Sequence, residues 1–84
     1  METEKWSRET SIGTFVIERR GAFYDLLFYE QFGDIDRLHY SDTLAEIMVF
    51  LFSAKHFKTL NQFYRMTALE LGIPTELSEW TNNS

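Results

Sequence analysis

Two histidines and a run of carboxylates are the residues whose types could bind a metal ion or transfer a proton. His39 follows Asp34 and Asp36 closely, and His56 lies in a basic stretch. A metal site needs at least three converging ligands, and these spacings match no recognised metal-binding motif. We therefore expect both histidines to lie at the surface, and we predict neither a metal nor a cofactor.

The remaining residue types do not form a known catalytic motif. The 84 residues include no cysteine, which excludes thiolate catalysis, disulfides and zinc–thiolate sites. The chain has neither a Gly-rich phosphate loop nor the nucleophile elbow of a hydrolase. A domain this small rarely encloses a small-molecule substrate. We therefore predict that the protein is not an enzyme and binds no small-molecule substrate.

The elements that position these residues belong to one small, aromatic-rich domain. Phe, Tyr and Trp make up 17% of the chain, and the net charge is −5. Length and composition predict a single folded domain over residues 1–84, with an N-terminal arm over 1–12, a folded core over 13–80 and a frayed tail over 81–84. The longest apolar run is too short to span a membrane, and no secretory signal precedes it. We expect a cytoplasmic protein without membrane contact.

A β-hairpin is the first element that the pattern predicts. Residues 14–19 and 22–29 are rich in β-branched and aromatic side chains, which favour strands. Arg20 and Gly21 between them fit a two-residue turn. This register predicts a core face and a second, half-polar face. The core face carries Phe15, Ile17, Tyr24, Leu26 and Phe28, and the second face carries Thr14, Val16, Glu18, Phe23, Asp25, Leu27 and Tyr29.

A third strand follows the hairpin, and helical segments follow the third strand. Polar and apolar residues alternate over 37–40, which predicts a short strand with Leu38 and Tyr40 directed inward. Thr43 and Glu46 fit a capping box at the start of a helix.

Apolar residues then recur at spacings of three and four up to Leu71, and Gly72 and Pro74 end the pattern. This periodicity fits two helices, or one long helix kinked near residues 53–58. The predicted fold class is therefore α+β: a three-stranded antiparallel β-meander followed by a helical hairpin, or by one long kinked helix, packed on one sheet face.

The C-terminal segment resembles the turn of a helix-turn-helix unit. Ala68 precedes Gly72 by four residues, and a short amphipathic segment begins near Thr75, as in helix-turn-helix repressors. Two glutamates and no base occupy the would-be recognition segment, which is the wrong charge for the major groove. The other interpretation is a helix that ends at this glycine, followed by a helical turn that returns Leu77 and Trp80 to the core.

Charge is unevenly distributed along the chain. Residues 22–50 carry six acids and one base, whereas residues 51–69 carry three bases and no acid. Overall acidity argues against binding to a nucleic-acid backbone. A nucleic-acid-binding regulator is therefore the alternative function. Its basic helix face would consist of Lys55, His56, Lys58 and Arg65.

We expect the chain to act by binding another protein, as a non-catalytic regulator, inhibitor or assembly factor, and to be dimeric. The sequence has more aromatic and aliphatic side chains than one small domain readily buries, and large exposed apolar patches usually mark interfaces. An acidic rim would set partner choice and association rate, and could mimic phosphates if the partner binds nucleic acid. The predicted partner-binding residues are Phe23, Leu27, Tyr29, Phe50 and Phe52, with a rim of Asp25, Glu30, Asp34, Asp36 and Asp42.

Overall fold

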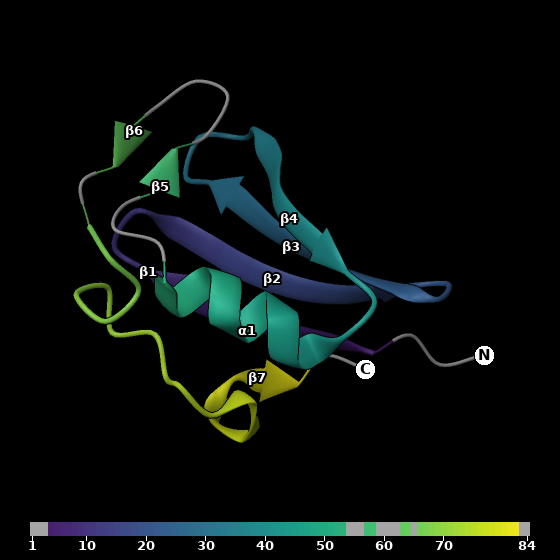
Figure 1. Cartoon of the computed structure of the whole chain (residues 1–84). Coiled ribbons are helices and arrows are strands. Elements are labelled where there is room, and N and C mark those ends of the chain that lie inside the picture. The colour runs from purple at the N-terminus through teal and green to yellow at the C-terminus, as the bar shows by residue number, and fades with distance from the viewer. Residues whose placement is uncertain (1–3, 54–56, 59–62, 65, 83–84) are drawn as a thin grey trace.

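A five-stranded antiparallel sheet with one helix across its face forms the body of the molecule (Figure 1). The structure, a computed structural model, describes residues 4–53, 57–58, 63–64 and 66–82. The strand order is β4-β3-β2-β1-β7. Its strands are β1 (Lys5–Thr10), β2 (Gly13–Arg20), β3 (Phe23–Glu30), β4 (Ile35–Ser41) and β7 (Thr81–Asn82).

The predicted fold is wrong in its strand number and in its second helix. Four consecutive strands form the meander, where three were predicted. The helix α1 (Leu44–Ser53) ends early, and β5 (Phe57–Lys58) and β6 (Phe63–Tyr64) follow and pair as a separate two-stranded sheet. Aromatic residues three or four apart mimic a helical stripe, but aromatic residues also favour strands. The broader α+β class is correct.

The predicted N-terminal arm contains a strand of the main sheet. Within β1, Trp6 lies opposite Ile17, and Arg8 lies opposite Phe15. Only Trp6 is apolar in this strand, so the period-two alternation that identifies a strand is absent from the sequence. The predicted frayed tail is likewise corrected, because Thr81 and Asn82 form β7 against β1.

The β2–β3 hairpin has the predicted faces in a shifted register. Its turn is Gly21-Ala22 rather than Arg20-Gly21, so that Arg20 pairs with Phe23. The shift is two residues, and side chains alternate with period two, so each one keeps its face. Gly21 has a φ of 62°, which suits a tight hairpin turn. We call the face that carries Phe15, Ile17, Tyr24, Leu26 and Phe28 the inner face, and the opposite face the outer face.

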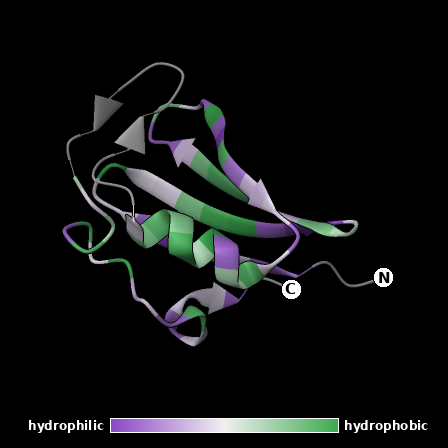
Figure 2. Cartoon of the chain, in the orientation of Figure 1, coloured by the Kyte–Doolittle hydropathy of each residue, from purple (hydrophilic) through white to green (hydrophobic). Residues whose placement is uncertain are grey.

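The hydrophobic core lies between the inner face and α1. Figure 2 shows the apolar part of β2 behind the helix. Ile47 and Leu51 of α1 are fully buried in this core. Later segments complete it with Ala68, Ile73 and Trp80.

Helix α1 begins at the predicted capping box. The Thr43 hydroxyl accepts a hydrogen bond from the Glu46 backbone N–H at 3.2 Å. In a capping box the Glu46 carboxylate would accept directly from the Thr43 backbone N–H. Here the Ser41 hydroxyl connects the two groups: Ser41 Oγ donates to the Glu46 carboxylate at 2.7 Å and accepts from the Thr43 backbone N–H at 3.3 Å. The start of this helix is therefore confirmed.

A single turn, rather than a second helix, precedes Gly72. The Ile73 N–H donates to the Ala68 carbonyl, and the Gly72 N–H donates to the Leu69 carbonyl, both at 3.0 Å. With a φ of 77° at Gly72, this pattern is a Schellman cap. The predicted cap at this glycine is confirmed, although the described residues just before it, 66–71, form no helix.

The chain then returns to the core, and no recognition helix forms. A three-residue 3-10 helix, η1 (Leu77–Glu79), precedes Trp80. The Trp80 ring is buried, and its Nε1 donates to the Pro74 carbonyl at 3.1 Å. The return of Leu77 and Trp80 to the core is confirmed, and the helix-turn-helix resemblance is wrong.

Candidate functional site

The outer face of the sheet carries the largest group of exposed apolar side chains. In the described part of the chain, α1 packs on the inner face only. Six large hydrophobic residues are exposed in the described part of the chain. Three of them lie on the outer face: Phe23 (44% exposed), Ile35 (54%) and Tyr40 (56%). Large contiguous patches of exposed apolar residues on soluble proteins often mark binding sites.

A β-bulge in β4 brings Tyr40 to this face. The pairing register with β3 shifts between Leu26 and Leu27, which leaves Leu38 as the extra residue of β4. A bulge reverses the side-chain alternation beyond it, so Arg37 and Tyr40 both lie on the outer face. The prediction that Tyr40 points inward is therefore wrong. Leu38 does pack, half-buried, against the core.

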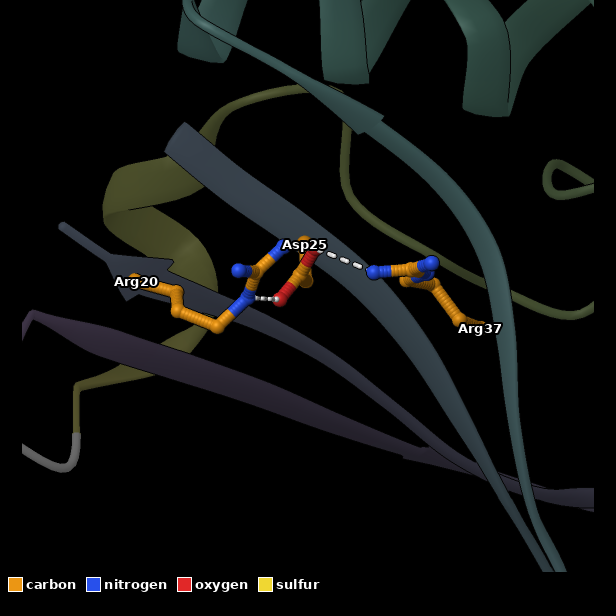
Figure 3. Close-up of polar contacts among 3 residues, drawn as sticks. All are labelled: Arg20, Asp25 and Arg37. Atoms are coloured by element: carbon orange, nitrogen blue, oxygen red, sulfur yellow. Dashed lines mark hydrogen bonds and ion pairs between the residues drawn. The ribbon is translucent and has the colours of Figure 1, made fainter. Parts of the chain in front are cut away.

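Two arginines meet at one buried carboxylate on the outer face. Asp25 of β3 accepts hydrogen bonds from Arg20 Nε at 2.7 Å and from Arg20 Nη2 at 3.4 Å. Arg37 Nη1 forms an ion pair with Asp25 Oδ1 at 3.8 Å. Figure 3 shows the two guanidinium groups reaching the carboxylate from opposite sides. Asp25 thus holds Arg20 by hydrogen bonds and attracts Arg37 through its charge alone.

Aromatic rings lie directly beside these charges. The Arg37 guanidinium lies 5.2 Å from the centroid of the Tyr40 ring, within the range of a cation–π contact. Tyr40 in turn meets Phe23 edge to face, with ring centroids 6.4 Å apart. We call these five residues the outer-face cluster: Arg20, Phe23, Asp25, Arg37 and Tyr40.

The cluster carries one net positive charge. The hydrogen bond and the charge of Asp25 both raise the pKa of Arg20 above its usual value, so this side chain stays cationic at every physiological pH. Asp25 offsets one of the two guanidinium charges. The arginine side chains are 58% and 52% exposed, so the remaining charge is accessible to a partner.

The structure brings together three of the five predicted apolar binding residues. Phe23, Leu27 and Tyr29 share the outer face, as predicted. Phe50 and Phe52 belong to α1, on the opposite side of the sheet, and pack partly against the core.

His39 lies on the inner face with Phe50. The Phe50 ring stacks on the His39 ring at a centroid distance of 4.3 Å and an angle of 7°. His39 is therefore half-buried rather than a surface residue. The bulge explains this position too, because it turns His39 toward α1.

The predicted acidic rim is mostly buried. Asp25, Glu30 and Asp36 are all less than a tenth exposed, whereas Asp34 and Asp42 are exposed. Within the cluster, the exposed charges are the cations of Arg20 and Arg37, whereas Glu18, opposite Asp25, forms an ion pair with Lys5 at 3.9 Å. Neither arginine was predicted as a binding residue, because Arg20 was assigned to the turn and because the sequence pattern does not show which residues of β3 and β4 pair.

Other chemistry-bearing residues do not converge in the described ranges. No group of three or more His, Asp or Glu residues there could hold a metal ion. A polar groove of about 330 Å³ at the other end of β2 and β3 is lined by residues that include Thr10, Tyr29 and Glu30. Of the predicted basic helix face, Lys55, His56 and Arg65 lie outside the described residues, and Lys58 belongs to β5.

Similarity to known proteins adds nothing to this geometry. No protein-family model, curated protein or solved structure matches the chain. Within the described ranges, no helix has the length and hydropathy that a membrane span requires. A function must therefore be argued from the outer-face cluster itself.

Proposed function

We propose that this chain is a non-catalytic protein-binding domain, acting as a regulator, inhibitor or assembly factor through the outer face of its sheet. The observation that carries the proposal is the outer-face cluster. Tyr, Phe and Arg are enriched at protein interfaces, and Arg and Tyr are frequent hot-spot residues. In this cluster Arg37 contacts Tyr40 and Tyr40 contacts Phe23, and all three side chains are about half exposed.

The position of the cluster in the sheet supports the proposal. Arg20 ends β2 and pairs with Phe23 at the start of β3, and the next cluster residue of β3, Asp25, is paired on both sides, with β2 and with Tyr40 of β4. Asp25 anchors Arg20 by two hydrogen bonds and attracts Arg37 to the same carboxylate before a partner arrives. Binding through pre-positioned side chains loses less conformational entropy than binding through mobile ones.

The proposal changes the predicted site in two ways. Leu27 and Tyr29 extend the cluster along β3, whereas Phe50 and Phe52 are left out because they pack partly against the core on the other side of the sheet. Asp34 and Asp42 stay candidates for a peripheral acidic contribution. The nucleic-acid-binding alternative stays a prediction, since Lys55, His56 and Arg65 of its basic face lie outside the described residues, although the segment after Gly72 forms η1 in place of a recognition helix.

Affinity capture with matched variants tests this function. The immobilised chain is incubated with extract of its native host as wild type, as Phe23→Ser/Tyr40→Ser, and as Val49→Ser. Val49 is an exposed apolar residue of α1, on the other side of the molecule, and serves as the control.

A protein retained by wild type and by Val49→Ser, but lost by the double variant, is the expected result. Circular dichroism checks that each variant is folded. Partners that are retained equally by all three proteins would contradict the assignment of the outer face.

A further inference from the structure

We infer that the outer-face cluster recognises an acidic peptide segment, in which the carboxylate of an Asp or Glu binds between Arg20 and Arg37 and neighbouring apolar side chains pack on Phe23 and Tyr40. This inference rests on the proposed function, and it names the chemistry of the partner. Three features of the cluster point to it.

The first feature is the number of hydrogen-bond donors. Each guanidinium has five N–H donors. Arg20 uses Nε and Nη2 on Asp25, and Arg37 approaches the same carboxylate only as an ion pair at 3.8 Å. Both side chains are more than half exposed. Donors therefore remain for a second carboxylate, whose geometry the guanidinium fork matches.

The second feature is the charge. Two guanidiniums and one carboxylate leave a single positive charge, which one further carboxylate balances. A phosphate group carries a larger negative charge, and a nucleic acid presents many of them to a chain whose net charge is −5. The cluster therefore suits a monoanion more than a phosphorylated or nucleic-acid partner.

The third feature is the apolar border. Phe23 and Tyr40 lie beside the two cations and are about half exposed. Apolar side chains next to the partner's carboxylate would cover these rings and exclude water. Exclusion of water strengthens the ion pair, because the local dielectric falls.

A second copy of this chain fits the cluster poorly. A two-fold dimer places the same patch of both copies together. Here that contact would bring the exposed guanidiniums of one cluster toward those of the other. Such like-charge contacts disfavour association, so the occupant is a different, acidic segment.

Selection from a phage-displayed library of random dodecapeptides tests the inference. The immobilised protein is used as wild type, as Arg37→Gln and as Arg19→Gln. Arg19 is a similarly exposed arginine that pairs with Glu4 outside the cluster, and it serves as the matched control. Arg37 is preferred over Arg20 for the test because its contact with the buried Asp25 is the longer one.

We expect wild type and Arg19→Gln to select peptides with an Asp or Glu next to apolar residues, and Arg37→Gln to lose the acidic preference. Selected peptides rich in apolar residues but without acids would overturn the inference and leave the proposed function standing. Failure to select any consensus would count against both. If wild type selects acidic peptides and Arg37→Gln selects them equally often, the inference is also overturned.

Titration of a selected peptide gives the quantitative check. A synthetic peptide is compared with its Glu→Gln or Asp→Asn analogue, and with a single-stranded oligonucleotide. The charge-assisted hydrogen bonds predict that the amide analogue binds about tenfold more weakly. Equal affinity of acid and amide peptides, or stronger binding to the oligonucleotide, would overturn the inference.

Discussion

Asp25 is the residue on which the outer-face cluster depends. Its side chain projects from the middle one of three strands, is only 7% exposed, and is compensated by Arg20 and Arg37. A buried carboxylate without such partners is costly. Replacement of this one residue should therefore affect both the stability of the fold and the positions of the arginines.

We expect Asp25→Asn to lower the free energy of unfolding by roughly 1–2 kcal/mol. The estimate is that of a lost charge-assisted hydrogen bond, reduced because the arginine partners are more than half exposed. Chemical denaturation measures the change. Asp42→Asn, at an exposed acid, is the control and should change stability by less than about 0.5 kcal/mol. Equal effects of the two substitutions would contradict the structural role of Asp25.

The role of Asp25 could not be predicted from the sequence. The sequence shows only that Asp25 belongs to an acid-rich stretch, which predicts an exposed acidic rim. Its true surroundings depend on the hairpin register, which places Arg20 beside Phe23, and on the pairing of β3 with β4, which brings Arg37 near. Both are properties of tertiary structure.

At the scale of elements, the β2–β3 hairpin contains a glycine that no other residue can replace easily. Gly13 has a φ of 146°, and a Cβ atom there would lie 2.5 Å from the Tyr29 carbonyl oxygen and 2.8 Å from the Phe28 ring. The neighbouring strand and a core side chain would both have to move.

Gly13→Ala should therefore destabilise the protein by more than about 2 kcal/mol, from backbone strain and overpacking together. Gly33→Ala is the matched comparison, because Gly33 also has a positive φ but no atom within 4 Å of its added Cβ. It should cost about 1 kcal/mol. Thermal unfolding of the two variants separates them, and an equal loss would refute the close approach at Gly13.

The N-terminus of α1 provides a second test at this scale. Thr43→Ala removes the acceptor for the Glu46 N–H and should cost about 1 kcal/mol. Thr43→Ser keeps a hydroxyl and should retain most of the stability. Chemical denaturation of both variants measures the difference. If the alanine and serine variants are equally stable, the side-chain cap contributes nothing.

Elements with strong local sequence signals were predictable, and strands that form only by pairing with a neighbouring strand were not. The hairpin faces, the start of α1 and the cap at Gly72 follow from periodicity, capping residues and a glycine. β1 is mostly polar and becomes a strand only by pairing with β2. For β5 and β6 the sequence predicts a helix where two strands form, because the spacing of their aromatic residues resembles that of a helix.

At the scale of the whole molecule, the two sheet faces have different roles. The inner face and α1 form the core, and the aromatic residues of β2, β3, β4 and α1 divide between this core and the outer face. Phe50 packs within the chain by stacking on His39, so it is not an aromatic residue left over for binding a partner. Phe23 and Tyr40 stay about half exposed on the outer face, where Tyr40 contacts Arg37.

Self-association, if it occurs, should be independent of the outer-face cluster. Like charges disfavour a two-fold contact through this patch. Light scattering at micromolar concentration should therefore give the same molar mass for wild type and for Phe23→Ser/Tyr40→Ser. A wild-type dimer that becomes monomeric in the double variant would show that the cluster binds a second copy instead.

Site-specific photo-cross-linking in the native host tests whether a partner protein binds the outer face of the sheet. A photoreactive phenylalanine analogue replaces Tyr40 in one variant and Val49 in another, because both positions are exposed but lie on opposite sides of the sheet. Because the partner should bind the outer face, we expect a discrete cross-linked protein from position 40 and none from position 49. Cross-links from position 49 alone would contradict it and would place the binding surface on α1.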